Sequence, residues 1–446
     1  MTTPVALAPA LAAPGTAGGI GLDSRIEWLA GRESLRRLRD AYPRLRYVLI
    51  GSGEFRFQQG LDGLPELVRK RMENADDSMY RRAIDNIRAA GLKPYGTIVA
   101  WKGIGSQSPS SMVRSIDGRR IDEVPRSKYA VEPSTDVCPN RPEVRSWLEN
   151  LAGGLFREYD IDGCMSRHAS FAHPALIEGL FGCWCEHCGE AAAGLGYDFE
   201  AMRSAMRRVL AELPKLDRRD LLRAVNNNMG FIGLFCRLAD SYEPARWYEF
   251  RSDSFTGGMR RIRQAVERER RNKEAGIGFM TWYPSFAPLV GQRYSDFAEA
   301  MHFAVLLFNH WQIFYSASLL GLANWLMENI RGLGETEALR AAYGLAGVDD
   351  LPVPALFSRM PVPASYLTKA SPGGSRAQWN YPESVWETTA PQLYKVRARI
   401  GNIKVHPCFR EDFPVSVQWK LEELSAQLGF DAVWYQPAVS DPKRFS

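Results

Sequence analysis

Four cysteines in two segments of the chain are spaced like the ligands of a metal ion. Cys138 begins a Cys-Pro-Asn-x-Pro-x-x-Arg segment, and Cys183, Cys185 and Cys188 follow in a Cys-x-Cys-x-x-Cys spacing. Four thiolates form the closed tetrahedral shell that is typical of a structural zinc site and leaves no position for catalysis. We therefore expect a Zn²⁺ ion that ties two loops together. Two alternatives remain: a ligand set in which His187 or His173 replaces Cys138, and reduced thiols that bind no metal.

Carboxyl and imidazole groups lie near the ends of several short apolar runs. Such groups carry out general acid and base chemistry, and an imidazole titrates near neutrality. The candidate catalytic residues are Glu54, Glu411, His168 and His406. Each also has a structural interpretation, as an ion-paired loop carboxylate or as a hydrogen-bonded wall of a pocket.

Aromatic, cationic and amide side chains follow the same apolar runs. Flat rings stack on the C–H faces of sugars, and polar side chains hydrogen-bond their hydroxyl groups, so the set suits a carbohydrate pocket. The candidate substrate-binding residues are Trp101, Lys102, Arg167, Trp282, Tyr283, Arg410, Trp434, Tyr435 and Gln436. Arg167 and Arg410 also suit an acidic sugar, or two ordinary ion pairs.

These residues need a scaffold that brings the ends of many strands together. Short apolar runs alternate with helical patterns, which is typical of βα units around a parallel sheet. Strands are predicted at 47–51, 95–101, 161–166, 276–282, 303–308, 403–406 and 431–435, with an eighth at either 19–22 or 354–357. Helices are predicted at 26–41, 78–90, 143–159, 294–302, 335–343, 390–400 and 415–428. The sequence therefore predicts an α/β fold, a (β/α)8 TIM barrel whose active site lies at the carboxyl ends of the strands.

The predicted barrel has a tail, an insertion and a long loop. Residues 1–22 are rich in Ala, Gly and Pro and are predicted to be a flexible tail, and 23–446 form the barrel. Within it, 183–272 contain the zinc loop followed by an inserted helical subdomain. Residues 358–389 carry many Pro and Gly residues and predict a long irregular loop.

The cysteine segments also carry a resemblance to a known family. Over about residues 90–195 the chain resembles the zinc-bearing part of the glycoside hydrolase family 42 β-galactosidases, and related bacterial glycosidase-like barrels. The resemblance implies hydrolysis of a glycosidic bond in a carbohydrate or glycoside. It also implies an acid/base glutamate after the strand before the zinc loop, but the matching positions hold Arg167, His168 and Ala169, so this glutamate is absent. The nucleophile would be Glu411 or Asp412.

The absent glutamate keeps two other functions open. One is a barrel enzyme that converts sugars without hydrolysis, such as a glycoside lyase or an isomerase that uses His168, His406 and Arg167. The other is a catalytically silent carbohydrate-binding barrel. Mass spectrometry distinguishes hydrolysis from the first alternative, because only hydrolysis adds water to the products.

Composition narrows the class of protein further. The 56 basic and 51 acidic residues give a net charge of +5, too balanced to require a nucleic-acid partner. No apolar run is long enough for a membrane helix. The odd number of cysteines, seven, favours a reducing compartment, and we expect a cytoplasmic location. No phosphate-binding loop or dinucleotide fingerprint occurs, so we expect no nucleotide cofactor. The sequence does not indicate an oligomeric state.

Overall fold

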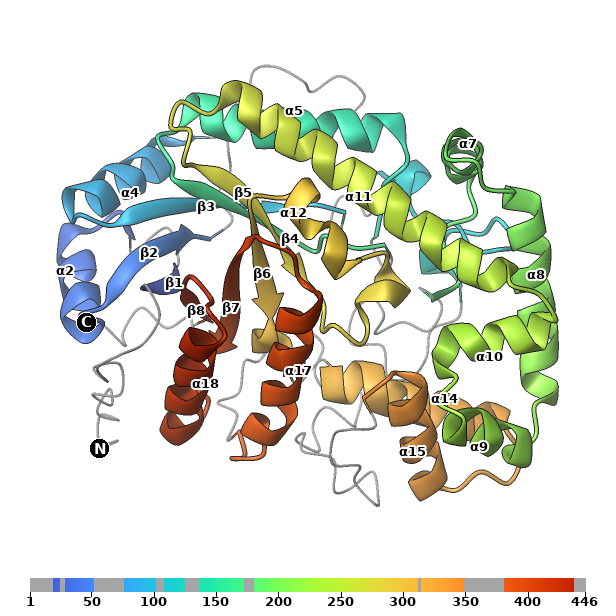
Figure 1. The fold of residues 1–446 in the computed structure, drawn as a ribbon. Coiled ribbons are helices and arrows are strands. Elements are labelled where there is room, and N and C mark those ends of the chain that lie inside the picture. The colour runs from blue at the N-terminus through green and yellow to red at the C-terminus, as the bar shows by residue number, and fades with distance from the viewer. Residues whose placement is uncertain are drawn as a thin grey trace.

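Eight parallel strands close into a barrel in chain order, as the computed structural model shows (Figure 1). The structure describes residues 19–24, 29–51, 76–101, 108–124, 136–171, 180–311, 314–348 and 381–436. The strands are β1 (Ile20–Ser24), β2 (Leu45–Ile50), β3 (Lys93–Val99), β4 (Gly163–Arg167), β5 (Gly276–Thr281), β6 (Phe303–Leu307), β7 (Lys404–Arg410) and β8 (Val433–Gln436). The predicted (β/α)8 barrel is therefore confirmed, and the eighth strand lies at the first of its two predicted positions. The other position, 354–357, lies outside the described residues.

Alternation along each strand divides the core into two layers. Successive side chains of a strand point to opposite faces. Leu49, Met165 and Val305 belong to a cluster that fills the barrel lumen. Their chain neighbours, such as Val48 and Ala304, belong to the larger cluster between the strands and the surrounding helices. The parity of a position along its strand therefore decides whether its side chain can reach the lumen.

Helices cover the outside of the barrel. In chain order they are α2 (Arg32–Ala41), α4 (Ser78–Ala89), α5 (Pro142–Glu158), α7 (Glu186–Gly194), α8 (Phe199–Glu212), α9 (Arg218–Asn226), α10 (Gly230–Ala239), α11 (Glu243–Glu269), α12 (Phe297–Ala300), α14 (Gly321–Asn329), α15 (Glu335–Leu345), α17 (Val385–Arg399) and α18 (Val415–Gln427). Gly91 and Gly429 have positive φ angles just beyond α4 and α18, the left-handed conformation that commonly ends a helix.

The described part of the long connection between β4 and β5 contains helices α7, α8, α9, α10 and α11. Helices α7 to α10 come first, and α8, α9 and α10 extend to one side of the barrel (Figure 1). The last helix, α11, runs beside α5 and contacts both α5 and β5. The range 183–272 predicted as zinc loop and insertion therefore includes one helix that packs on the barrel itself.

Two of the predicted boundaries of the tail and the long loop differ from the structure. β1 begins at Ile20, inside the range predicted as a tail, because Ile20 and Leu22 are buried in the outer core. Helix α17 begins at Val385, inside the predicted loop, and Pro391 lies within it. A proline is tolerated best in the first turn of a helix, so the sequence favours a later helix start than the structure has. The tail residues 1–18 and the loop residues 349–380 lie outside the described residues.

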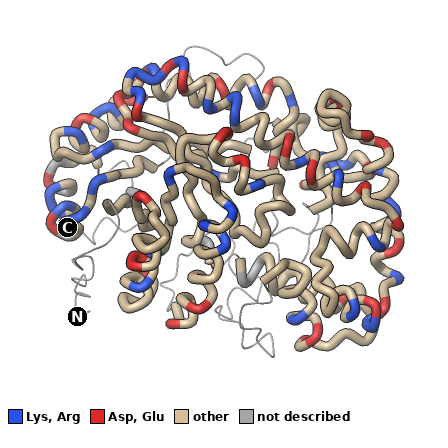
Figure 2. The backbone as a smooth tube through the Cα atoms, in the orientation of Figure 1, with Lys and Arg blue, Asp and Glu red and all other residues tan. Residues whose placement is uncertain are grey.

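Charged residues of both signs are mixed over the outer helices (Figure 2). On α11, Arg260 pairs with Glu299 and Arg263 with Glu267, at 2.7 and 2.9 Å. Exposed pairs of this kind contribute at most about 1 kcal/mol each, so they describe a solvated face rather than a source of stability. Among the described helices, none combines the length and the hydropathy that a membrane span requires.

Candidate functional site

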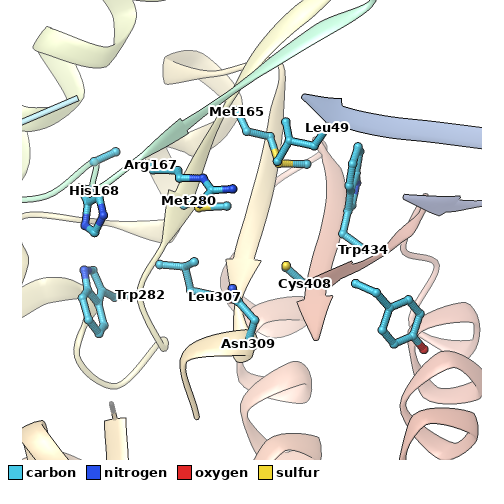
Figure 3. Close-up of a pocket in the computed structure, with 12 residues that line it drawn as sticks. Leu49, Met165, Arg167, His168, Met280, Trp282, Leu307, Asn309, Cys408 and Trp434 are labelled. Atoms are coloured by element: carbon cyan, nitrogen blue, oxygen red, sulfur yellow. The ribbon is translucent and has the colours of Figure 1, made fainter. Parts of the chain in front are cut away.

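A cavity opens at the carboxyl ends of the barrel strands (Figure 3). Its volume is about 610 Å³ when the part open to solvent is included. Side chains of six strands or their ends surround it, with an apolar floor and a polar rim. The lining residues are Leu49, Met165, Arg167, His168, Ala169, Met280, Trp282, Leu307, Asn309, Cys408, Trp434 and Tyr435.

The end of β4 supplies the charged part of this lining. Arg167 is the last residue of β4 and His168 follows it with a φ of 53°. A positive φ is uncommon outside glycine and often marks a functional turn. Figure 3 shows the His168 ring beside Trp282, with Arg167 directed toward Met280. Five of the predicted site residues are therefore brought to one cavity: Arg167, His168, Trp282, Trp434 and Tyr435.

Two predicted aromatic residues lie elsewhere. Trp101 is 1% exposed and packs on Phe255 of α11 and Phe279 of β5, in the layer outside the barrel. Tyr283 is stacked on Phe314 with ring centroids 4.1 Å apart. Neither lines the cavity as predicted, because the chain turns away from the lumen after β3 and after Trp282.

Tyr435 borders the cavity but is anchored behind β8. Its hydroxyl donates a hydrogen bond of 2.6 Å to Glu422 of α18, and Glu422 also pairs with Arg44. Burial raises the pKa of Tyr435 well above its usual value. The ring therefore belongs to the outer layer, since odd-numbered positions of β8 face the helices.

His406 lies in the lumen and does not line the cavity. It is 4% exposed, its ring stacks on Phe303 at 5.0 Å, and its Nδ1 accepts a hydrogen bond from Trp434 Nε1 at 3.3 Å. Burial lowers the pKa of His406 to about 3, and the charge of Lys404 adds to this effect. At neutral pH His406 is therefore a neutral acceptor that positions Trp434.

Arg410 and Gln436 lie near the rim without lining the cavity. The Arg410 guanidinium binds both carboxylate oxygens of Asp412, at 2.7 and 2.8 Å. The side-chain carbonyl oxygen of Gln436 accepts a hydrogen bond of 2.6 Å from the side-chain amide of Asn309. Gln436 thereby fixes the orientation of a residue that does line the cavity. Arg410 forms an ion pair, the alternative interpretation of this residue.

The predicted carboxylates are not found in the described lining. Glu411 accepts a hydrogen bond from Tyr42, which lies at the end of α2, and its backbone N–H donates to Gln436. Glu54 and Lys102 lie outside the described residues. Among the described residues that line the cavity there is no Asp or Glu.

Several lining residues were not selected from the sequence. Asn309 lies two residues beyond Leu307, the last residue of β6, and alternation places both on the lumen side. Its position just after an apolar run was the available signal. Cys408, Met165 and Met280 are lumen residues within strands, and nothing in their type distinguishes them from ordinary core residues.

The four cysteines of the predicted metal site are brought together. Their sulfur atoms lie within 4.8 Å of one another, and all four residues are buried. Cys138 belongs to the loop between β3 and α5, Cys183 and Cys185 to the loop between β4 and α7, and Cys188 to the first turn of α7. The cluster therefore joins the loops that leave the carboxyl ends of two neighbouring strands.

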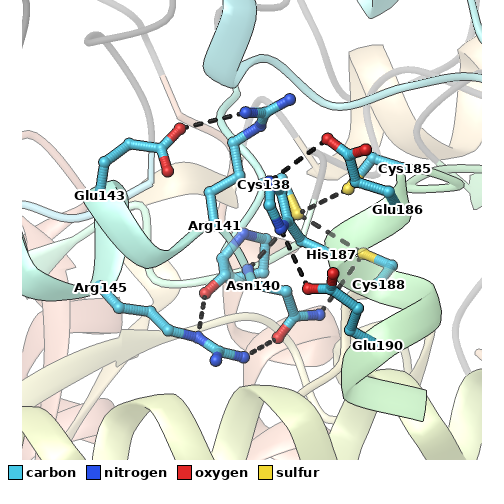
Figure 4. A network of polar contacts seen from close by, with 11 residues as sticks. Cys138, Asn140, Arg141, Glu143, Arg145, Cys185, Glu186, His187, Cys188 and Glu190 are labelled. Carbon is cyan, nitrogen blue, oxygen red and sulfur yellow. Dashed lines mark hydrogen bonds and ion pairs between the residues drawn. The ribbon is translucent and has the colours of Figure 1, made fainter. Parts of the chain in front are cut away.

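Hydrogen-bond donors surround these sulfur atoms (Figure 4). The Asn140 backbone N–H donates to Cys138 Sγ and its side-chain amide to Cys188 Sγ, both at 3.4 Å. The Asn140 side-chain oxygen accepts hydrogen bonds from Arg145 and from Ser254 of α11. Asn140 therefore links two cysteines to the helix that packs behind them.

The geometry of the cluster fits a metal ion with tetrahedral coordination. Metal–sulfur bonds of about 2.3 Å give sulfur–sulfur distances of about 3.8 Å. Cys138 Sγ lies 3.5 Å from the sulfurs of both Cys185 and Cys188. His187, the alternative ligand, contacts Glu186 and Glu190 instead, and His173 lies outside the described residues. The four-cysteine set is thus capable of binding a metal ion.

No protein-family model and no curated protein matches the chain. Among solved structures, it is similar to the glycoside hydrolase domain of PgaB (BpsB) from Bordetella bronchiseptica, with 12% identity, a TM-score of 0.46, and coverage of 97% of this chain and 95% of that chain. It is also similar to the catalytic domain of a β-amylase from Paenibacillus polymyxa, with 11% identity, a TM-score of 0.46, and coverage of 97% and 96%. For a β-galactosidase from Bacillus circulans sp. alkalophilus the identity is 14%, the TM-score 0.39, and the coverage 65% and 40%. All three are carbohydrate-active proteins by name, and at these identities the similarity concerns the fold.

Proposed function

We propose that this barrel is a glycoside hydrolase-like enzyme that cleaves a glycosidic bond in a carbohydrate or small glycoside. The observation that carries the proposal is the lining of the cavity. Two tryptophans, Trp282 and Trp434, border it together with Arg167, His168 and Asn309. Indole faces pack against sugar C–H groups, and guanidinium, imidazole and amide groups bind hydroxyl groups.

Cleavage requires a proton donor to the leaving oxygen and a group that activates water or attacks the sugar. His168 is the proton-transfer group of the described lining, and an imidazole with access to solvent can donate a proton near neutrality. Glu54, which follows the apolar run at 47–51, is the proposed carboxylate partner. Arg167 and Asn309 would orient the sugar hydroxyls, and an acidic sugar would pair with Arg167.

The test is hydrolysis of a panel of 4-nitrophenyl glycosides and oligosaccharides in water enriched in ¹⁸O. Mass spectrometry should find one ¹⁸O atom in the released sugar. We expect His168→Asn and Glu54→Gln each to lower kcat/KM by roughly 10²–10⁴-fold, the usual contribution of a general acid or base. Products without added oxygen, or no turnover by the wild type, would contradict hydrolysis.

One observation favours a second function. The described lining holds His168 and Arg167 but no carboxylate. A glycoside lyase or isomerase that moves a proton through His168 would use such a site. It predicts conversion without incorporation of ¹⁸O, so the same experiment separates the two reactions. Thermal stabilisation by sugars without any turnover would instead favour the silent binding barrel.

We also propose that Cys138, Cys183, Cys185 and Cys188 hold a structural Zn²⁺ ion. The ion would supply a divalent charge that the four thiolates share, and the closed ligand set leaves no place for a substrate. Metal analysis of protein purified without added zinc should find about one ion per chain, and Cys185→Ser should abolish its binding. A stable protein that contains no metal would contradict this proposal.

A further inference from the structure

We propose that Asn309 accepts a hydrogen bond from a hydroxyl group of the bound sugar and thereby selects the substrate; the inference rests on the carbohydrate substrate of the proposed function. Asn309 lines the cavity and is 2% exposed. Its side-chain oxygen, Oδ1, has no hydrogen-bond partner among the described residues. Buried polar atoms are almost always hydrogen-bonded, so a buried acceptor without a partner beside a cavity indicates that its partner is a ligand.

The strand order places Asn309 between the two tryptophans of the lining. It lies in the short turn Phe308–His310 that follows β6. In the closed barrel β6 lies next to β5, which leads to Trp282, and one strand away from β8, which carries Trp434. Figure 3 shows Asn309 just beyond Leu307, between the two indole rings. A sugar that packs on either tryptophan therefore lies beside Asn309.

The contacts of the amide group fix which of its atoms is left for a ligand. The Nδ2 atom of Asn309 donates to Oε1 of Gln436 at 2.6 Å, so Oδ1 is the end without a partner in the described contacts. Gln436 is itself held in β8, where its backbone carbonyl accepts the Glu411 N–H at 3.0 Å. Phe308 stacks on Phe409 of β7 with ring centroids 6.0 Å apart, which holds the turn. The acceptor is therefore oriented before a ligand binds, and this lowers the cost of ordering it.

The rest of the polar lining makes this acceptor selective. Arg167 carries N–H donors only, and the Trp434 indole N–H donates to His406. A sugar hydroxyl both donates and accepts, so it can donate to Asn309 while it accepts from another group. A deoxygenated, methylated or fluorinated position cannot donate, and it would leave the Asn309 oxygen unpaired in the complex. The site therefore selects a sugar with a free hydroxyl group at the position that faces Asn309.

The test measures binding, so its result does not depend on turnover. Thermal unfolding of the wild type with a panel of methyl glycosides identifies the sugar that stabilises the protein most. Calorimetry then compares this parent sugar with its monodeoxy and monodeoxyfluoro derivatives. At one ring position we expect both derivatives to bind roughly 10–100-fold more weakly than the parent, because neither hydrogen nor fluorine donates a hydrogen bond. In Asn309→Leu the parent and these two derivatives should bind equally weakly.

Two further variants separate this role from a structural one. Asn309→Asp keeps an acceptor oxygen and should retain the preference for the parent sugar. Asn329→Leu is the matched control, because Asn329 is exposed on α14 and donates to the Trp325 carbonyl of the same helix, and its affinities should equal those of the wild type. Circular dichroism and thermal unfolding establish that the variants fold.

The outcomes distinguish this role from the proposed function. A folded Asn309→Leu variant that still prefers the parent sugar would overturn the role of Asn309 and leave sugar binding in place. No stabilisation of the wild type by any sugar would overturn the carbohydrate substrate and this role together.

Discussion

The surroundings of His168 and His406 give the two imidazoles different chemistry. His168 borders the cavity, whereas His406 is enclosed by Phe303, Tyr47 and Trp434 in the lumen. Burial disfavours the charged form of His406, so it accepts the Trp434 N–H and does not deliver protons. Of the two histidines predicted from the sequence, His168 is thus the one that borders the cavity.

The lowered pKa of His406 predicts a pH-dependent stability. The pKa is about 3 in the folded protein and about 6.5 in an unfolded chain. Between these values the unfolded state binds more protons, so the contribution of His406 is complete above pH 6.5 and decreases as the pH falls. We expect the free energy of unfolding of the wild type to fall by about 1.4 kcal/mol more per pH unit, below about pH 6, than that of His406→Gln. Urea unfolding between pH 4 and 7.5 measures both slopes.

His302 provides an internal control for this experiment. Burial and two arginines lower its pKa to about 4, so it titrates in a similar range in both proteins. A pH dependence that comes from His302 alone would be the same in the wild type and in His406→Gln. Equal slopes would therefore contradict the role assigned to His406.

Asn140, the third residue of the Cys-Pro-Asn-x-Pro-x-x-Arg segment, contacts the cysteine sulfur atoms. Its two N–H donors contact the sulfurs of Cys138 and Cys188, and such second-layer hydrogen bonds orient metal ligands. We expect Asn140→Ala to lower zinc affinity by roughly 10–100-fold, measured by competition with a chromophoric chelator. Glu143→Gln is the control, because Glu143 pairs with Arg141 and contacts no cysteine sulfur in the described contacts. Equal affinities of the Asn140→Ala variant and the wild type would contradict the assignment.

At the scale of elements, the cysteine cluster lies between the loops that leave β3 and β4. Among the described residues no strand pairing joins the two loops, since both isolated bridges lie within the first loop. A backbone hydrogen bond of 3.0 Å from the Trp184 N–H to the Arg114 carbonyl does connect them. Trp184 stacks on Trp247 of α11 with ring centroids 3.8 Å apart, which attaches the second loop to a barrel helix. A bound ion would add a further connection between the loops themselves.

Removal of the metal should therefore loosen these loops before the barrel. After chelation we expect faster amide hydrogen exchange in peptides that cover 136–141 and 180–188, measured by mass spectrometry. Peptides of α18, on another side of the barrel, should keep their exchange rates. Cys185→Ser should reproduce the pattern without a chelator, and unchanged exchange in both loops would count against a structural metal.

The strands could be predicted from the sequence because buried strands are short apolar runs between turn residues. The site was predictable only in part, because a shift of one residue moves a side chain from the lumen to the outer layer. Trp434 and Tyr435 are neighbours of the same residue class, yet only Trp434 enters the lumen. The cysteine cluster could be predicted, with a histidine in place of Cys138 left open, since its spacing reports the chemistry of the ligands and not the parity of a strand.

At the scale of the whole molecule, glycines paired with large rings fill the narrow lumen. Gly21 is the register partner of Trp434, Gly163 of Tyr95, and Gly278 of Phe303. A Cβ atom at any of these glycines would lie 2.1–2.2 Å from the partner's ring. Each ring therefore occupies the space that a side chain on the neighbouring strand would need, and the pairs recur around the closed barrel.

Gly21→Ala tests this packing where the barrel closes between β1 and β8. The added methyl group should displace the Trp434 ring and lower the free energy of unfolding by about 1–3 kcal/mol. Gly194→Ala is a matched control, because nothing lies within 4 Å of a Cβ atom at Gly194 in α7, and its stability should stay within about 1 kcal/mol of the wild type. Because Trp434 borders the cavity, Gly21→Ala should also weaken binding of any sugar found to stabilise the wild type. A stable Gly21→Ala variant with unchanged sugar binding would show that the Trp434 ring does not depend on the missing side chain at position 21.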